Sequence, residues 1–253
     1  MKNKNILITG SSGFIGSFLV EGALDKGFTT WAGVRKTSSK QYLQNSSIQF
    51  IEIDLASYEE LRKSLKKHKE THGVFDVIIH CAGVTQCKNK KEFYHINYEQ
   101  TKSFIETLIE LDMTPKQFVF ISTLSVFGPI KEACYTPVRE SDTPQPNTAY
   151  GLSKLKTEQY IQSIADFPYT IFRPTGVYGP REKDYYMMAK SIKNHLDFSV
   201  GYKPQKLTFV YVKDLVNAVF LAISKEKTQR TYFATDGKVY TSRTFSDLIQ
   251  KEL

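Results

Sequence analysis

Cysteine is scarce in this sequence, and its few cysteines are not paired. Among 253 residues there are 3 cysteines, Cys81, Cys87 and Cys134, and no two of them form a C-x-x-C motif. An odd number of unpaired cysteines argues against a disulfide framework and against a structural zinc site. We therefore expect a protein of a reducing compartment, located in the cytoplasm, with no metal site.

Long hydrophobic runs are missing as well. No apolar stretch approaches the roughly 18 residues that a membrane-spanning helix requires. The N-terminal MKNKNILITG begins like a secretion signal, but Thr9 and Gly10 cut its apolar part short. This stretch therefore predicts the first strand of a fold, and we expect no membrane partner.

Acidic residues are too few to balance the basic ones, 26 against 34, which gives a formal net charge of +8. Much of the excess lies in residues 62–69, without interleaved aromatic residues. This arrangement favours a solvated helix face over a nucleic-acid site. His68 and His72 are four residues apart, a spacing that can chelate a metal, but the surrounding lysines would repel a cation.

What the sequence does contain is an alternation of β-rich and helical stretches over the first 170 residues or so. The predicted strands are Asn5–Thr9, Thr29–Val34, Ile48–Ile53, Val74–Cys81, Gln117–Thr123 and Tyr169–Arg173. The predicted helices are Gly13–Lys26, Tyr58–Lys69, Glu92–Leu111 and Ala149–Ser163. Continuous apolar triplets in the strands fit burial on both faces. The pattern predicts an α/β fold with a doubly wound parallel sheet.

A glycine-rich turn follows the first predicted strand. Residues 9–16 read TGSSGFIG, and an amphipathic helix comes directly after them. Glycines let a backbone approach a pyrophosphate, and the exposed N–H groups at the start of a helix hold the anion. We expect a dinucleotide to be bound here by Gly10, Ser12, Gly13, Phe14, Ile15 and Gly16.

The end of the second predicted strand favours NADP over NAD. An acidic residue roughly 20 residues beyond the turn would bind the ribose hydroxyls of NAD. This chain has Arg35 and Lys36 there instead. A guanidinium matches a phosphate in geometry, so we predict NADP. NAD remains the alternative if Arg35 points into solvent or stacks on the adenine.

Two further strand ends offer cofactor contacts. Asp54, followed by Leu55, could accept a hydrogen bond from the adenine amino group, or could simply cap the next helix. The fourth strand ends at His80, which we interpret as a packing residue. It is followed by small residues that let a backbone pass close to the cofactor, namely Cys81, Ala82 and Gly83.

Tyr150 and Lys154 form the strongest chemical signal. They stand four residues apart in YGLSK, so they share one face of a helix. An ammonium beside a phenol lowers the phenol's pKa from about 10, which would let Tyr150 exchange a proton near neutral pH. Thr123 could polarise a substrate oxygen, with Ser125 as the competing hydroxyl. The predicted catalytic residues are therefore Tyr150, Lys154 and Thr123.

The ordered set of motifs resembles the extended short-chain dehydrogenases, the NAD(P)-dependent epimerase/dehydratase family. The motifs that carry the resemblance are TGSSGFIG (9–16), HCAG (80–83), STLSVFG (122–128), YGLSK (150–154), RPTGVYGP (173–180) and FVYVKDL (209–215). The resemblance covers nearly the whole chain and implies a Rossmann fold. It implies that Lys154 also bonds the nicotinamide ribose. It further implies cofactor contacts at Asn97, Pro174, Thr175 and Val177.

The same resemblance implies a homodimer in which helices 92–111 and 149–163 pair into a four-helix interface. Two departures concern the substrate. Gly176 stands where nucleotide-sugar epimerases often have an asparagine, and Leu207 where an arginine often precedes the next strand. Both missing groups recognise anions, which disfavours a nucleotide-sugar substrate. The chain stops at Leu253 inside an apparent helix, which suggests either a shortened substrate-binding portion or a truncated chain.

The rhythm of strands and helices breaks after Arg173. We predict a dinucleotide-binding domain over residues 1–173 and a small substrate-binding portion over residues 174–253. Within the latter, a strand–helix unit over residues 207–224 should return to the main sheet.

These observations predict an NAD(P)-dependent oxidoreductase that moves a hydride between the nicotinamide and an alcohol or ketone carbon of a small molecule. One alternative is a nucleotide-sugar epimerase or dehydratase that recycles NAD within each turnover. A second alternative is a cofactor-sensing protein without catalysis.

Overall fold

The computed structural model describes residues 4–130, 135–194, 196 and 206–252. Its main sheet has seven strands, all parallel: β1 (Asn5–Thr9), β2 (Thr29–Val34), β3 (Gln49–Glu52), β4 (Val77–His80), β5 (Gln117–Ile121), β6 (Tyr169–Pro174) and β10 (Arg230–Ala234). The strand order is β10-β6-β5-β4-β1-β2-β3. The order reverses between β1 and β4, so the predicted doubly wound sheet is confirmed, with its switch point between these two strands.

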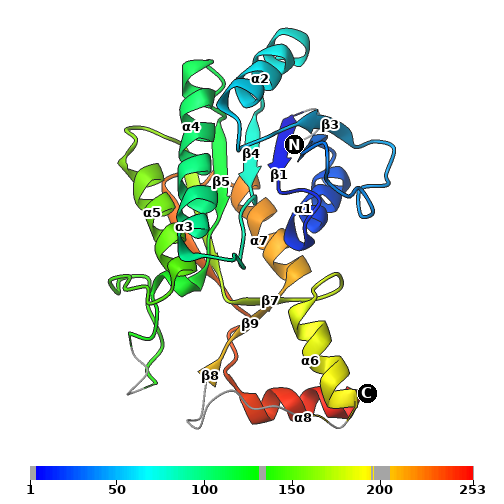
Figure 1. The fold of residues 1–253 in the computed structure, drawn as a ribbon, viewed down its shortest axis with the longest axis vertical. Coiled ribbons are helices and arrows are strands. Elements are labelled where there is room, and N and C mark those ends of the chain that lie inside the picture. The colour runs from blue at the N-terminus through cyan, green and yellow to red at the C-terminus, as the bar shows by residue number, and fades with distance from the viewer. Residues whose placement is uncertain (1–3, 131–134, 195, 197–205, 253) are drawn as a thin grey trace.

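Helices cover both faces of the sheet (Figure 1). The longer ones are α1 (Phe14–Asp25), α2 (Tyr58–His72), α4 (Gln100–Glu110), α5 (Ala149–Ser163) and α7 (Val212–Ser224). Successive residues of β1 show how the sheet is buried. Ile6 and Ile8 join the core beneath α1 and α7, while Leu7 joins the core beneath α2 and α4. All three are fully buried, as the continuous apolar runs predict.

The helix expected over residues 92–111 is broken into three parts. The structure has α3 (Lys90–Phe93), a π-helix over Tyr94–Glu99 and then α4. Asn97 lies in the π-helix, and its carbonyl oxygen accepts hydrogen bonds from the hydroxyls of Thr101 and Thr157 at 2.8 and 2.9 Å. Hydroxyls that bond a helical carbonyl disturb the regular backbone ladder, and π-turns are typical of functional sites.

One expectation about the C-terminal part is wrong. The strand of the 207–224 unit does not return to the main sheet, because β9 (Phe209–Tyr211) pairs with β7 (Gly176–Tyr178) in a separate two-stranded sheet. Its helix, α7, does return and packs on α1. The strand that joins the main sheet from this part of the chain is β10, which pairs with β6.

The rest of the C-terminal part projects beyond β7 and β9 (Figure 1). It contains α6 (Asp184–Lys193), α8 (Ser242–Glu252) and a short sheet of β8 (Lys206–Leu207) and β11 (Tyr240–Thr241). Its centre is Phe209, whose ring is surrounded by those of Tyr178, Tyr185, Tyr240 and Phe245.

In the main domain, a short 3-10 turn, η2 (Leu124–Val126), follows β5.

No helix in the described ranges combines the length and apolar character needed to cross a membrane. Within the same ranges, no three potential metal ligands from His, Cys, Asp and Glu come together. His68 is buried in the core instead, with its ring 4.4 Å from that of Trp31 and 4.2 Å from that of Phe75. Its Nε2 has no hydrogen-bond partner among the described residues.

Burial of His68 makes the stability of the fold sensitive to acid. Burial, with a smaller effect of nearby His72, lowers the pKa of His68 from 6.5 to about 4. Between these two pH values the unfolded chain binds a proton that the folded chain does not, so stability falls as the pH falls. We expect His68→Phe, which keeps the ring packing and removes the unpaired nitrogen, to raise stability by about 1 kcal/mol at pH 7.

The stability advantage of His68→Phe over the native protein should be larger at pH 5, where the native protein is already losing stability. Urea unfolding at the two pH values checks this, with the exposed His95→Gln as the control. His80 is unchanged in the native protein and in His68→Phe, so a difference in pH dependence between these two proteins reports on His68. Parallel pH dependences of the native protein and His68→Phe would contradict the assignment.

Candidate active site

The glycine turn lies against the end of β4, at the switch point of the sheet. Gly10 has a φ of +66°, and a Cβ on it would come within 2.7 Å of the backbone nitrogen of Ala82. A Cβ on Gly16 would collide with the carbonyl of Gly10. Neither position has room for a side chain, because α1 and β4 both approach the turn closely.

Helix α1 begins directly after this turn. Its N-cap is Gly13, and no side chain caps the first backbone N–H groups of the helix. Ser11 ties the turn to the neighbouring strand by donating to the carbonyl of Gly33 at 2.8 Å. Uncapped N–H groups at a helix start are suited to an anion such as a pyrophosphate. Ser12, Phe14 and Ile15 are partly buried around the same turn.

The residues after β2 and β3 lie at the same edge of the sheet. Arg35 and Lys36 are exposed, and the ammonium of Lys36 lies 3.5 Å from a carboxylate oxygen of Glu52. Asp54 accepts from the backbone N–H of Ala56 at 3.1 Å, while the cap of α2 is Ser57 rather than Asp54. Leu55, after Asp54, packs against the core beneath α2 and α4. Arg35 has no ion-pair partner among the described residues and can meet a ligand at this edge, while Lys36 is partly engaged with Glu52.

Asn97 fixes the loop that follows β4. Its Oδ1 accepts from the backbone N–H of Val84 at 2.8 Å, and its Nδ2 donates to Ser153 of α5 at 3.0 Å. A Cβ on Gly83 would lie 2.9 Å from Oδ1 of Asn97. Asn97 thus joins the Cys81–Gly83 strand end to α5. Its direct contact with a cofactor stays a prediction.

The segment after β6 crosses the same edge. Pro174 is buried at the end of β6, and Thr175 donates from its backbone N–H to the carbonyl of Ala234 at 3.0 Å. Val177 lies in β7 and packs against the core beneath α1 and α7. These residues therefore form a fixed wall beyond the strand ends.

Tyr150 and Thr123 come together where β5 meets α5. Thr123 follows the last residues of β5, and its hydroxyl is near enough to Tyr150 to act on the pKa of the phenol. The Thr123 hydroxyl donates to Oγ of Ser125 at 3.1 Å. Ser125 itself is exposed, whereas Thr123 is buried. Thr123 is therefore the buried hydroxyl beside the phenol.

Lys154 lies one turn further along α5 and is buried. Its ammonium donates to the carbonyl of Ile121 at 2.7 Å and stands 4.0 Å from the centre of the Phe120 ring. Burial lowers the pKa of Lys154 to about 8. The ammonium is therefore still charged at neutral pH, and it is anchored on the end of β5.

The expectation that Lys154 lowers the pKa of Tyr150 is wrong for this structure. Burial raises the pKa of Tyr150 to about 12, and this effect outweighs the lowering by the hydrogen bond with Thr123. The main contacts of Lys154 are with Ile121 and Phe120 instead. Tyr150 is therefore protonated at neutral pH, ready to act as a proton donor.

The sequence prediction missed a buried ion pair next to these residues. Glu158, one turn beyond Lys154, binds Arg173 of β6 through Nε at 3.1 Å and through a terminal nitrogen at 2.6 Å. It also accepts from the hydroxyl of Ser122. The i, i+4 spacing from Lys154 to Glu158 is the signal that could have placed Glu158 on the same face of α5.

His80 is a packing residue, as expected. Its two ring nitrogens lie 2.9 Å from the hydroxyls of Thr9 and Thr101, and Phe104, Phe118 and Phe120 stack around it. Burial lowers its pKa to about 3, so the imidazole is neutral. It joins the end of β1 to α4 beneath the site.

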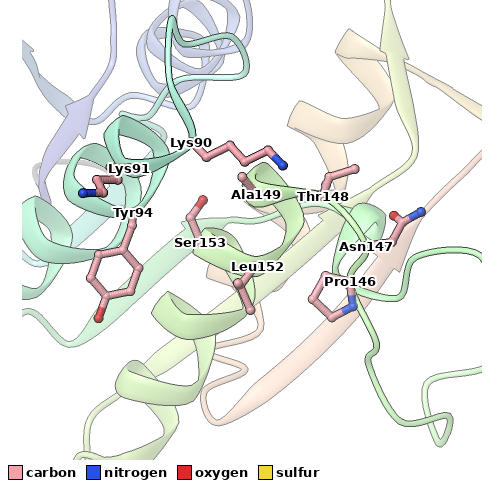
Figure 2. Close-up of a pocket in the computed structure, with 9 residues that line it drawn as sticks. All are labelled: Lys90, Lys91, Tyr94, Pro146, Asn147, Thr148, Ala149, Leu152 and Ser153. Atoms are coloured by element: carbon pink, nitrogen blue, oxygen red, sulfur yellow. The ribbon is translucent and has the colours of Figure 1, made fainter.

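A surface hollow of about 420 Å³ lies beside the site, between the α3 region and the start of α5 (Figure 2). Lys90, Lys91 and Tyr94 line one side of it, and Thr148, Leu152 and Ser153 line the other. None of the predicted catalytic residues lines it. The hollow therefore borders the catalytic helix from outside.

The profile of the NAD dependent epimerase/dehydratase family matches residues 6–234. This chain belongs to that family. The match includes the glycine turn, the end of β5, the YGLSK helix start and the wall after β6. A nicotinamide dinucleotide fits the structure as well, since two glycines without room for a side chain and an uncapped helix start form a pyrophosphate cradle.

Similar family members perform different reactions. Sterol-4-alpha-carboxylate 3-dehydrogenase (decarboxylating) of Bos taurus is 29% identical over 231 residues, which cover 87% of this chain and 60% of that protein. UDP-glucose 4-epimerase of Vibrio cholerae is 27% identical over 248 residues, which cover 92% and 71%. This chain thus spans about three fifths of the length of the sterol dehydrogenase.

Solved structures of family members share the fold. The UDP-glucose 4-epimerase of Thermotoga maritima, determined with UDP-glucose, superposes with a TM-score of 0.85 at 24% identity, covering 98% of this chain and 82% of that one. The UDP-N-acetylglucosamine 4-epimerase of Methanobrevibacter ruminantium gives a TM-score of 0.83 at 22% identity, covering 99% and 82%.

Replacing Gly16 and replacing Gly13 should affect stability and dinucleotide binding differently. Gly16→Ala forces a Cβ into the Gly10 backbone, so we expect a loss of about 1–3 kcal/mol of stability together with weaker dinucleotide binding. Gly13 has an ordinary extended backbone, and a Cβ there would meet only the Gly10 carbonyl at 3.3 Å. Gly13→Ala should therefore keep the melting temperature and lose dinucleotide affinity only.

Thermal unfolding and fluorescence titration with NADH and NADPH separate the two effects. If Gly13→Ala bound both dinucleotides as tightly as the native protein, the turn would not be the pyrophosphate site.

Proposed function

We propose that this protein is an NAD(P)-dependent oxidoreductase that interconverts an alcohol and a ketone carbon of a small molecule. The observation that carries the proposal is the grouping of Tyr150 with the buried hydroxyl of Thr123, one helical turn from the buried ammonium of Lys154 that bonds the Ile121 carbonyl. This group lies at the carboxyl end of β5, close to the glycine turn at the switch point of the sheet, where ligands of such folds bind.

Each residue has a role that follows from its contacts. Tyr150, held protonated by its burial, donates its proton to the substrate oxygen in the direction of reduction and takes it back in oxidation. The Thr123 hydroxyl orients the phenol and stabilises charge that develops on the substrate oxygen. The Lys154 ammonium, fixed on the carbonyl of Ile121, supplies positive charge beneath them. The bound nicotinamide supplies or accepts the hydride.

The structure fits a substrate other than a nucleotide sugar. At Gly176, a side chain would run into the Tyr185 hydroxyl and the Phe209 ring. An acid accompanies the rings around Phe209, since Asp236 accepts from the Tyr240 hydroxyl at 2.6 Å. A carboxylate at this place suits an uncharged substrate better than a diphosphate, which it would repel.

A nucleotide-sugar epimerase is the second candidate, because the Vibrio cholerae UDP-glucose 4-epimerase is similar over 92% of this chain. Retention of NAD through purification, with conversion of UDP-glucose and no net change in NADH, would favour this candidate over a net redox enzyme.

We further propose a homodimer formed through α5 and the π-helix. Tyr94 and Leu152 are large apolar side chains on these elements, and they are 41% and 48% exposed. Burial of such side chains against a second copy would remove apolar surface from water.

Replacing the phenol tests the acid/base assignment. We expect Tyr150→Phe to lower kcat by about 100-fold or more, because a positioned proton donor contributes this much in general acid–base catalysis. Turnover is measured as the oxidation of NADPH or NADH with a panel of ketones. Tyr160→Phe, on the same helix but away from Thr123, is the matched control. Full turnover by Tyr150→Phe would remove Tyr150 from the mechanism.

The coenzyme preference depends on Arg35. The family is described as NAD dependent, while the free guanidinium of Arg35 favours the 2′-phosphate of NADP. We expect Arg35→Ser to raise the Kd for NADPH about tenfold or more, since a charged hydrogen bond is lost, and to leave NADH binding nearly unchanged. Lys40→Ser, whose ammonium lies over the Phe50 ring, is the control. Equal Kd values for the two coenzymes in the native protein would contradict the NADP prediction.

A further inference from the structure

The end of β5 meets α5 at three consecutive residues. The Ile121 carbonyl accepts from Lys154 at 2.7 Å, the Ser122 hydroxyl donates to Glu158, and Thr123 lies beside Tyr150. The partners on α5 are spaced four residues apart, so they form one stripe along the helix. Two of the three partners are the proposed catalytic residues, and the third is Glu158.

Glu158 is the most firmly held of the three. Its side chain is fully buried, and its carboxylate binds Nε and a terminal nitrogen of Arg173 as well as Ser122. The Arg173 guanidinium lies 5.0 Å from the centre of the Phe127 ring. The Ser122 backbone N–H donates to the Phe172 carbonyl of β6 at 2.7 Å. One carboxylate therefore joins α5, β5 and β6.

Such a pair is not explained by stability alone. Removing two charges from water is costly, and apolar residues of similar volume often stabilise a fold as well or better. A buried charge pair can instead fix one arrangement of neighbouring elements. In an α-helix, a shift of one residue rotates a side chain by about 100°, which would turn Tyr150 away from Thr123.

We propose that Glu158 is a positioning residue: its carboxylate, held by Arg173 and Ser122, fixes the register of α5 on the end of β5 and places a negative charge one helical turn from the Lys154 ammonium. This rests on the proposed function in so far as Tyr150 and Lys154 are the catalytic pair.

The charges around Lys154 show why Glu158 matters to it. The titratable groups that act on Lys154 or on which it acts are His80 and Cys81 from β4 and the loop after it and Glu158 from α5, with Arg173 bound to Glu158 and Tyr150 one turn away on α5. His80 is neutral because burial lowers its pKa to about 3, and burial raises the pKa of Cys81 to about 11. Tyr150 is also protonated. Two of these groups raise the pKa of Lys154, Cys81 first and Glu158 second, and Glu158 is the carboxylate among them.

The test measures the ionisation of Lys154 directly, without a substrate. The protein is labelled with [13Cε]lysine, and the Lys154 signal is assigned from its absence in Lys154→Arg. We expect Glu158→Gln to lower the pKa of Lys154 by about one pH unit or more, as loss of a nearby opposite charge does. Ser122→Ala removes one contact and no charge, so it should leave this pKa nearly unchanged while lowering kcat.

Two further variants keep the experiment decisive. Glu158→Gln leaves the Arg173 guanidinium without its carboxylate, so Glu158→Gln with Arg173→Met removes both charges if the single variant does not fold. Gln117→Leu is the matched control. The buried Gln117 side chain, at the opposite end of β5, donates hydrogen bonds to the Thr170 hydroxyl and to the Lys227 carbonyl. This substitution should lower the melting temperature and leave the pKa of Lys154 unchanged.

An unchanged pKa of Lys154 in both Glu158 variants would overturn the proposal. So would a shift of the same size in Gln117→Leu, because Glu158 would then act only through stability. The failure of the proposed function looks different: Tyr150→Phe would retain turnover whatever the pKa of Lys154.

Discussion

The burial of both faces of the parallel sheet is the constraint on which this structure depends. Because Ile6, Leu7 and Ile8 alternate between two helix-covered cores, no side chain in the middle of a strand can reach a ligand. Polar groups that meet a ligand must stand beyond the strand ends, and the reversal of strand order between β1 and β4 leaves room there. The glycine turn, Thr123 and the Pro174 wall are all at this edge for the same reason.

Burial also sets the protonation states of the side chains beneath the strand ends. The imidazole of His80 and the thiol of Cys81 are both kept neutral by burial. Burial lowers the pKa of Lys154 only to about 8, so its ammonium remains charged at neutral pH, and it donates to a strand carbonyl. The polar interior beneath the site therefore contains few charges, each with a specific partner. Such an interior holds the phenol and the ammonium in place with little freedom to reorganise.

Relatives of this chain with similar identity differ in the reaction that their names give. The sterol dehydrogenase and the UDP-glucose 4-epimerase are about equally similar to this chain. The aromatic group around Phe209, with Tyr185 over Gly176, belongs to the C-terminal part of the fold and lies apart from the glycine turn. Our proposal assigns the choice of substrate to this β7, β9, α6 and α8 region.

The sequence by itself determined the parallel sheet, the glycine turn and the Tyr150–Lys154 helix, because each rests on local periodicity or on residues close together in the chain. The tertiary structure decided the rest. The Asn97 carbonyl in the π-helix accepts from the Thr157 hydroxyl of another helix, and β9 pairs with β7 instead of joining the main sheet. The high pKa of Tyr150 and the Glu158–Arg173 pair depend on burial between distant segments, which no local pattern records.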